Sequence, residues 1–193
     1  MTEFLTGKGY EKWFAELGVT DAPVTRRGLA TTLKFFHDQM PSLPRKSQLS
    51  YLKGIDLHQL VEEVTLEAGC VVSAYRKHNE DPFKTFYTRP GNSVHRLGVN
   101  PEPGGVARGH VRYRVKSPVV ALESKCAPAW DTWSDDRPEH LRHYYEASGR
   151  GAQLIIPESR AVLEIVDWSA PRAASDATNG GRARWSAASG WRP

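Results

Sequence analysis

Three features of the sequence predict an α+β fold. Residues 2–40 place apolar residues at the spacing of amphipathic helices. From residue 54 onwards the pattern changes to short segments rich in β-branched and aromatic residues, separated by turns that contain Gly, Pro and Asn. The regular alternation of strands and helices that builds a parallel sheet is absent. At 193 residues, the chain is long enough for one domain with a substantial hydrophobic core.

Two helices are predicted in the first forty residues. The first spans residues 2–18, and the second begins near Thr25 as N-cap and ends before Pro41. The apolar stripe of the second helix consists of Leu29, Leu33, Phe36 and Met40. The segment 41–50 contains two prolines and is predicted to be a polar connector. Residues 1–50 are therefore interpreted as a helical N-terminal segment, either a lid or a docking module for another protein.

The predicted strands follow in short segments. Residues 54–69 fit either a short helix or a strand, and a helix is predicted within 134–147. Strands are predicted at 70–76, 83–88, 110–115 and 119–124, with a strand–turn–strand unit in 149–166. In residues 110–115, apolar and arginine side chains alternate, as in a half-buried strand. The segment 169–193 is poor in aliphatic residues and is predicted to be a disordered tail.

Composition limits the classes of function. Hydrophobic residues make up 39% and charged residues 25% of the chain, as in ordinary globular proteins. No apolar run approaches the roughly 20 residues of a membrane span, and no signal-peptide pattern is present. We therefore expect a protein that is made in the cytoplasm and has no membrane partner. A specialised secretion system could export it without such a signal.

The net charge of +4 is concentrated at the end of the chain. Residues 171–193 contain four arginines and one aspartate, a net charge of +3, and residues 1–170 carry the remaining +1. Action on nucleic acid through Arg108, Arg112 and Arg114 is an alternative function. The nearly neutral body argues against a broad basic face for nucleic acid.

Metal and thiol chemistry have weak sequence support. His140 and His143 lie three residues apart on the predicted helix, but they are not part of an HExxH motif. We interpret them as surface histidines and expect no metal site. Cys70 and Cys126 lack the context of a nucleophile, and either a reducing compartment or plain burial is the default for both.

The segment from Gly69 to Gly91 carries two arginines beside aromatic residues. Arg76 lies at the end of the first β-type segment and Arg89 just beyond the second. A guanidinium group binds phosphate through two parallel hydrogen bonds, so such an arginine suits an anionic nucleotide. The alternative is a surface hairpin with solvated arginines.

A Gly-Arg-Gly-Ala-Gln motif occupies residues 149–153. The two glycines permit close backbone approach, and Gln153 begins the strand that follows. A glutamine at a strand end can both donate to and accept from a ribose hydroxyl or a water molecule. A helix C-cap would explain the glycines equally well.

Taken together, these motifs resemble a bacterial polymorphic-toxin domain of the ADP-ribosyltransferase-like fold, related to the tuberculosis-necrotizing-toxin type of NAD glycohydrolase. The resemblance covers residues 54–166 and implies a split β-sheet domain. It implies that Arg76 binds the phosphate or ribose of NAD and that Gln153 acts beside the nicotinamide ribose. Substrate-binding positions implied in the same way are Tyr75, Phe86, Tyr87, Thr88 and Arg89. On this basis residues 51–168 form the NAD-binding catalytic domain.

The sequence departs from many transferases at two places. Tyr87-Thr88-Arg89 stands where they carry Ser-Thr-Ser, and Gln153 stands where most have glutamate. A neutral amide activates a protein acceptor less well than a carboxylate, which favours hydrolysis with water as acceptor. Glu158 or Glu164 would reverse this preference if either pointed into the pocket.

The implied function is a toxin or effector that cleaves the nicotinamide–ribose bond of NAD or NADP as a glycohydrolase. The alternatives are an ADP-ribosyltransferase acting on a protein or nucleic acid, and a non-catalytic binding module of the same fold. NAD(P) would be the substrate, and no cofactor is expected. A cognate immunity protein is an implied partner.

Overall fold

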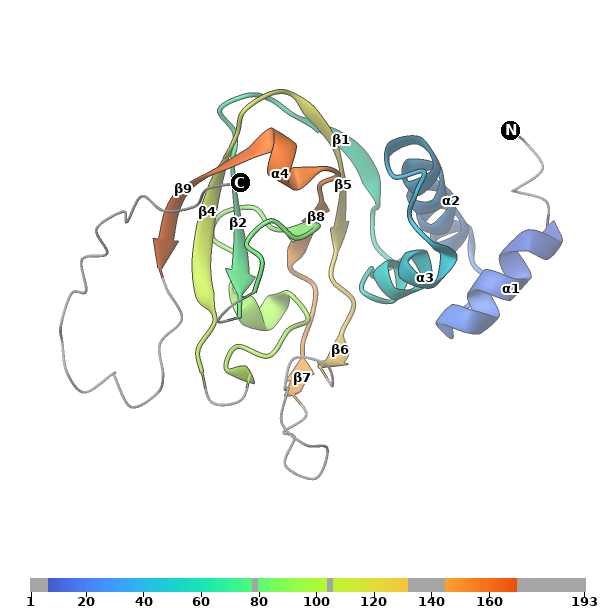
Figure 1. Cartoon of the computed structure of the whole chain (residues 1–193). Helices are drawn as coiled ribbons and strands as arrows, with labels where there is room; N and C mark the ends of the chain where they lie inside the picture. Colours follow the sequence, from blue (N-terminus) through green and yellow to red (C-terminus); the bar gives the residue numbers. More distant parts are fainter. Residues whose placement is uncertain (1–6, 78–79, 104–105, 132–144, 170–193) are drawn as a thin grey trace.

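The computed structural model describes residues 7–77, 80–103, 106–131 and 145–169, and these form three layers (Figure 1). The first layer contains the helices α1 (Gly7–Leu17), α2 (Pro23–Gln39) and α3 (Arg45–Lys53). The second is a sheet with the order β1 (Glu62–Leu66), β5 (Val119–Lys125), β8 (Ala152–Ile155), β3 (Phe86–Tyr87). The third is a sheet with the order β2 (Val71–Arg76), β4 (Gly109–Val115), β9 (Leu163–Ser169).

Smaller elements connect or extend these layers. A 3-10 turn, η2, spans Val94–Arg96, and the short helix α4 spans Ser159–Val162. The two-stranded sheet of β6 (Ala129–Asp131) and β7 (Tyr145–Ala147) projects from one end of the molecule (Figure 1). Every strand pair described is antiparallel. The α+β class predicted from the sequence is confirmed.

The helical layer differs from the prediction at α3. α1 lies within the predicted first helix, and α2 begins two residues before the predicted cap. Thr25 is the third residue of α2, where its Oγ1 accepts a hydrogen bond of 2.9 Å from the Ala22 backbone N–H. α3 lies largely in the predicted connector, and that prediction was wrong. Pro44 precedes the helix as its N-cap instead of interrupting it, and Leu52 buries one face.

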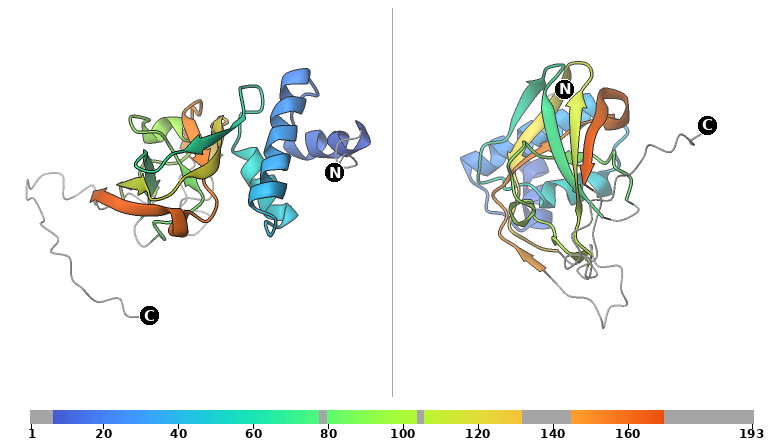
Figure 2. Two further views of the ribbon diagram at one scale, coloured as in Figure 1. Left: turned by 90° about the horizontal axis from the view of Figure 1, so that it is seen from above. Right: turned by 90° about the vertical axis from the view of Figure 1, so that its left-hand side faces the viewer.

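Two hydrophobic cores separate the layers. The first lies between the helices and the first sheet, and its largest fully buried members include Leu29, Phe35, Phe36 and Leu52. The second lies between the two sheets and contains Tyr113, Leu154 and Leu163. Successive side chains of a strand point to opposite faces, so Leu154 faces the second core while Ile155 faces the first. The views in Figure 2 show the helices on one side of the molecule and β2, β4 and β9 on the other.

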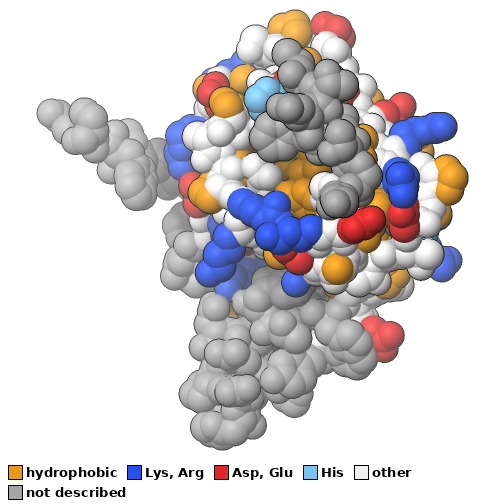
Figure 3. Space-filling model, turned by 90° about the vertical axis from the view of Figure 1, so that its right-hand side faces the viewer, with side chains coloured by type: hydrophobic (Ala, Val, Ile, Leu, Met, Phe, Trp, Pro, Cys, Tyr) orange, Lys and Arg blue, Asp and Glu red, His pale blue; other side chains and the backbone are white. Residues whose placement is uncertain are grey.

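The outer face of the helical layer carries both signs of charge. Figure 3 shows this face, with hydrophobic side chains near its centre and basic and acidic side chains around them. One basic side chain, Arg45, stacks on Trp13 with its guanidinium 4.0 Å from the ring centroid and pairs with Glu16. These contacts fix α3 against α1.

The predicted hairpin of residues 70–76 and 83–88 does not form. β2 pairs with β4, β3 pairs with β8, and β3 is only two residues long. The two segments meet at one bridge, where Ser73 and Thr88 exchange backbone hydrogen bonds of 2.8 Å in both directions. This bridge joins the two sheets. Beyond it, β2 and β3 diverge.

The later elements agree with the sequence in part. In β4 the apolar residues Val111, Tyr113 and Val115 are buried and the arginines between them are exposed, as predicted. The turn predicted between the last two strands contains α4. Residues 145–147 form the strand β7, so the end of the predicted helix 134–147 was wrong. The rest of that helix, His140, His143 and the tail from residue 170 lie outside the described residues.

Candidate functional site

A pocket lies at the fork where β2 and β3 diverge. Its volume is about 70 Å3. The lining residues are Ala74, Tyr75, Arg76, Phe86, Tyr87, Thr88, Leu97, Val99, Cys126 and Gln153. Six of the seven residues singled out in the sequence, all except Arg89, therefore lie around one pocket. They come from β2, from β3 and its end, and from β8.

Gln153 is held from several directions. Its side chain is 5% exposed, and its Nε2 donates hydrogen bonds to the Gly54 carbonyl at 2.9 Å and to Ser124 Oγ at 3.1 Å. The Lys125 carbonyl lies 3.5 Å from the same nitrogen. Its Oε1 accepts a hydrogen bond of 3.1 Å from the Cys126 thiol. The amide is therefore fixed by β5, by the end of α3 and by Cys126.

The Gly-Arg-Gly turn before β8 requires both glycines. Gly149 has a φ of 67°, and a Cβ there would lie 2.6 Å from the backbone of Ala127. A Cβ on Gly151 would lie 2.4 Å from the Arg96 carbonyl oxygen. Arg150 between them also adopts a positive φ, of 64°, which a non-glycine residue rarely does. The close backbone approach predicted for these glycines is confirmed, and it places the start of β8 against the loop of η2.

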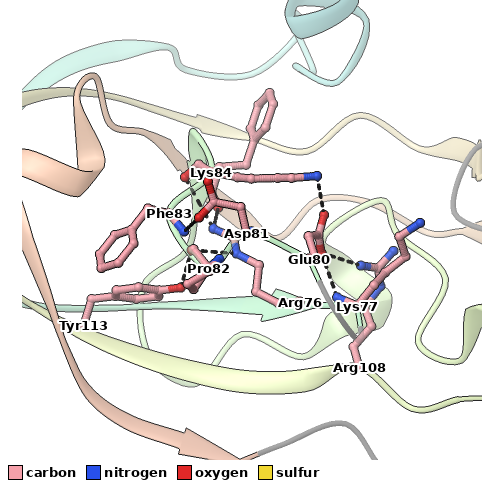
Figure 4. Close-up of polar contacts among 10 residues, drawn as sticks. Arg76, Lys77, Glu80, Asp81, Pro82, Phe83, Lys84, Arg108 and Tyr113 are labelled. Carbon is pink, nitrogen blue, oxygen red and sulfur yellow. Dashed lines mark hydrogen bonds and ion pairs between the residues drawn. The ribbon is translucent and has the colours of Figure 1, made fainter. Parts of the chain in front are cut away.

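Arg76 is buried at the fork and binds backbone carbonyls. It is 5% exposed, and its Nε donates to the Pro82 carbonyl at 3.0 Å. Its Nη2 donates to the Phe86 carbonyl at 3.0 Å and to the Lys84 carbonyl at 3.4 Å. The guanidinium thus satisfies carbonyls of the segment leading into β3, where β2 and β3 no longer pair (Figure 4).

Among the described residues no carboxylate forms a salt bridge with Arg76, although its charge contributes to lowering the pKa of the nearby Asp81 carboxyl. Its guanidinium carbon lies 5.1 Å from the centroid of the Tyr87 ring, a cation–π contact. A buried charge is costly unless it is neutralised. The fork therefore presents a positive group that an anionic ligand would stabilise.

An ion-paired segment, residues 80–84, covers Arg76 (Figure 4). Glu80 accepts hydrogen bonds from the Lys77 backbone N–H at 2.7 Å and from Lys84 Nζ at 2.6 Å, and Arg108 lies 3.7 Å away. Burial raises the pKa of Glu80, but these hydrogen bonds and charges outweigh it and leave the pKa below its usual value.

Two buried hydroxyl groups at the fork lack hydrogen-bond partners. Within the described part of the chain these are Ser73 Oγ and Tyr87 Oη. Tyr87 Oη lies near Ser159 and Arg76 without a hydrogen bond of normal geometry to either, and burial raises its pKa. Unsatisfied buried hydroxyl groups are rare in folded proteins.

Three of the remaining predicted residues line the pocket and are held by contacts within the protein, and Arg89 lies outside it. Thr88 is buried, and its Oγ1 donates a 2.6 Å hydrogen bond to the Ala152 carbonyl. The Tyr75 hydroxyl donates to the Asn92 carbonyl at 3.0 Å. The Phe86 ring packs edge-on against Tyr51 of α3, with centroids 4.8 Å apart. Arg89 lies outside the pocket lining, where Nη2 pairs with Glu123 at 2.7 Å.

A larger hollow of about 550 Å3 lies at the other end of β8. Its lining residues are Met40, Phe83, Thr85, Ile156, Pro157, Glu158, Ser159, Arg160 and Ala161. It is wide and open, and none of the predicted site residues line it. Glu158 lines this hollow and Glu164 pairs with Arg114 on the surface, so neither carboxylate lies in the pocket at the fork. The convergent polar groups make the smaller pocket the candidate site.

Sequence reasoning missed several contributors to this site. Cys126 and the Gly54 carbonyl hold Gln153, while Leu97 and Val99 form a wall. A backbone carbonyl gives no sequence signal, and the thiol contact depends on the pairing of β5 with β8. The length of the loop 91–108 was the available signal for Leu97 and Val99.

The described residues contain neither a membrane-spanning helix nor a cluster of metal ligands. None of the helices described there is long and apolar enough to cross a membrane. The same part of the chain contains no group of three His, Cys, Asp or Glu side chains arranged to hold a metal ion.

Comparison with solved structures identifies a protein of similar fold. The structure of Tse6 in complex with Tsi6 matches with a TM-score of 0.59 and 22% identity, covering 76% of this chain and 99% of that one. Rhs1-CT in complex with its cognate immunity protein RhsI1 matches with a TM-score of 0.39 and 20% identity, covering 63% of this chain and 84% of that one. Neither family models nor curated protein sequences gave a match. The chain therefore shares its fold with the domain of Tse6.

Proposed function

We propose that this protein is a toxin or effector enzyme that cleaves the nicotinamide–ribose bond of NAD or NADP, with water as the acceptor. The observation that carries the proposal is the pocket at the fork, where a buried arginine and a fixed glutamine come together with aromatic residues. The ADP-ribosyltransferase-like arrangement is part of the proposal. The likeness to Tse6 concerns the fold alone.

The reaction requires little activation of a nucleophile. The C1′–N1 bond breaks and its electron pair neutralises the pyridinium nitrogen, which makes nicotinamide a good leaving group. Water then forms the new bond to C1′ and releases one proton to solvent, giving ADP-ribose. Orientation and electrostatic stabilisation can supply most of the rate.

Six of the pocket residues have a role in this proposal. Gln153 accepts a hydrogen bond from the attacking water or a ribose hydroxyl. Arg76 supplies the positive charge that attracts the pyrophosphate, while its carbonyl bonds keep the fork in shape. Tyr75, Phe86 and Tyr87 provide aromatic surface for the nicotinamide ring. Thr88 holds β3 against β8 next to Gln153.

The substrate needs more room than the pocket offers in this conformation. Ligand pockets are commonly about 300–1,000 Å3, several times the 70 Å3 seen here. We infer that Leu97 and Val99 move outward when NAD binds, because they belong to a long loop, whereas most of the other lining residues lie in β2, β3 and β8.

The test is incubation of the purified protein with NAD, without any acceptor, while free nicotinamide and ADP-ribose are measured. Equal release of both products supports the glycohydrolase. Slow nicotinamide release that accelerates with lysate, with label on a macromolecule, would instead identify a transferase. Absence of release with both NAD and NADP would leave only a binding module.

A protein partner belongs to the same proposal. Tse6 was solved in complex with Tsi6. By analogy, we propose a cognate immunity protein that binds this chain and blocks NAD cleavage. Inhibition at a one-to-one ratio by a candidate protein would test this analogy.

A further inference from the structure

We propose that the carboxamide of Gln153 acts only as a hydrogen-bond acceptor towards a ligand, and that Cys126 is the positioning residue that holds it so. The consequence for catalysis rests on the proposed NAD cleavage. The orientation of the amide rests on contacts within the protein and can be tested separately.

Both hydrogens of the Gln153 amide nitrogen are already used. The Gly54 carbonyl and Ser124 Oγ accept them at 2.9 and 3.1 Å. A carboxamide has two N–H groups, so none remains for a ligand. The reversed orientation would place Oε1 against the Gly54 carbonyl, with the Lys125 carbonyl also near. Repulsion between these oxygens excludes that orientation.

The amide oxygen keeps one free acceptor site. A carboxamide oxygen accepts two hydrogen bonds, and among the described residues only the Cys126 thiol donates to Gln153 Oε1. Burial raises the pKa of Cys126 to about 12, so the thiol remains a neutral donor at physiological pH. Cys126 and Gln153 both line the pocket. The free acceptor site of Oε1 is therefore what the amide offers to a ligand there.

This arrangement defines what Gln153 can recognise. An acceptor can bind a ribose hydroxyl or the attacking water, and its partial negative charge favours a cationic ribose. It cannot donate to a phosphate or a carbonyl oxygen. Gln153 thus serves the ribose end of the substrate, and the positive charge of Arg76 serves the anionic part.

The same contacts explain why glutamine rather than glutamate occupies this position. A carboxylate at residue 153 would face the Gly54 carbonyl without a hydrogen to share. Only a protonated glutamate could restore one donor. The charged or titratable groups that line the pocket are Arg76, Tyr75, Tyr87 and Cys126. Burial raises the pKa of Tyr75, Tyr87 and Cys126.

The three hydrogen bonds that hold the Gln153 amide, to Gly54, Ser124 and Cys126, are called the clamp below. Hydrogen exchange of glutamine side chains tests the clamp without any substrate. The chain has four glutamines, Gln39, Gln48, Gln59 and Gln153, and the NMR signal of the last is identified by its loss in Gln153→Ala. We expect the amide protons of Gln153 to exchange at least tenfold more slowly than those of the exposed Gln39 and Gln59. Equal exchange rates would overturn the clamp.

Three cysteine variants test the role of Cys126. Cys126→Ala removes the donor and is expected to accelerate exchange at Gln153 and to lower kcat for NAD by roughly 3- to 10-fold, with little change in KM. Cys126→Ser keeps a donor and should recover part of both losses. Cys70→Ala is the control, because Cys70 lies outside the pocket. Unchanged exchange and unchanged kcat in Cys126→Ala would overturn the positioning role.

Gln153→Glu tests the acceptor-only orientation through its pH profile. The activity of the variant relative to wild type should rise as pH falls, because protonation restores a donor towards Gly54. Activity that matches wild type at pH 8 would show that a carboxylate is tolerated, and the inference would be wrong. If the wild type cleaves no NAD, the proposed function fails and the exchange rates still decide the clamp.

Discussion

Ser73 and Thr88 join the two sheets through a pair of backbone hydrogen bonds, each 2.8 Å long. β2 pairs with β4 on one side of this bridge, and β3 pairs with β8 on the other. The strands separate immediately afterwards, and the candidate pocket occupies the opening. The site thus lies beside the one backbone bridge that the described residues form between strands of the two sheets, next to the core that packs between them.

The hydroxyl of Thr88 is expected to stabilise this junction. Thr88→Val removes the 2.6 Å hydrogen bond to the Ala152 carbonyl in a buried setting. We expect a loss of about 1–2 kcal/mol in the free energy of unfolding. Thr88→Ser keeps the hydroxyl and should lose less than Thr88→Val in urea denaturation. The reverse order would show that the methyl group, and not the hydrogen bond, matters.

Arg76 is expected to be required for folding as well as for any binding. Arg76→Ala leaves the carbonyls of Pro82 and Phe86 without their donor, and unsatisfied buried groups cost about 1–3 kcal/mol each. We expect a loss of about 2–4 kcal/mol, measured by chemical denaturation. A surface substitution, Arg89→Ala, is the comparison and should lose less than about 1 kcal/mol, because its ion pair is partly exposed. Equal losses of stability in the two variants would contradict the role of Arg76 as the donor to these buried carbonyls.

The Gly-Arg-Gly turn gives a third prediction. Gly151→Ala places a Cβ 2.4 Å from the Arg96 carbonyl oxygen. Neither the Cβ nor the carbonyl can move away without a shift of the backbone. Overpacking of this kind costs about 1–3 kcal/mol and should shift the start of β8. Gly54→Ala is the matched control, because its φ is −86° and a Cβ meets nothing closer than 3.4 Å. Similar melting temperatures for the two variants would contradict this account.

The sequence predicted the strands better than their pairing. The alternation in β4 was readable because one face is buried and the other solvated. The pairing of β2 with β4, rather than with the next segment, depends on long-range contacts that no local pattern reveals. The helix α3 was hidden by prolines that precede it. A proline does not break a helix when it lies just before or within the first turn of that helix.

The candidate site was predictable in its residue types and less so in their roles. Gln153 follows two glycines at a strand start, a pattern that marks close backbone approach. Arg76 carries a charge next to aromatic residues, and the sequence suggested contact with phosphate. Its three carbonyl contacts were not predictable, because they depend on how the segment before β3 folds back over β2.

Glu80 should make stability depend on acid pH. Burial of Glu80 acts against ionisation, but hydrogen bonds from Lys84 and the Lys77 backbone dominate, and its pKa lies below the ordinary value of 4.5. The stabilisation is therefore complete above pH 4.5 and disappears as pH falls through the lower folded-state pKa. Glu80→Gln should lose about 1–2 kcal/mol at pH 7. It should also show a shallower decline in acid than wild type, measured by urea unfolding between pH 3 and 7. An unchanged decline would assign the acid sensitivity to other carboxyl groups.

The most direct measurement of the central claim compares NAD cleavage by wild type, Gln153→Ala and Gln59→Ala, each shown to be folded by circular dichroism. Gln59 is exposed and lies outside the pocket, so its variant controls for loss of a glutamine. We predict release of nicotinamide and ADP-ribose by wild type and Gln59→Ala, and a loss of about 100-fold or more in kcat/KM for Gln153→Ala. Equal NAD cleavage by folded Gln153→Ala would contradict the claim that this pocket is the active site.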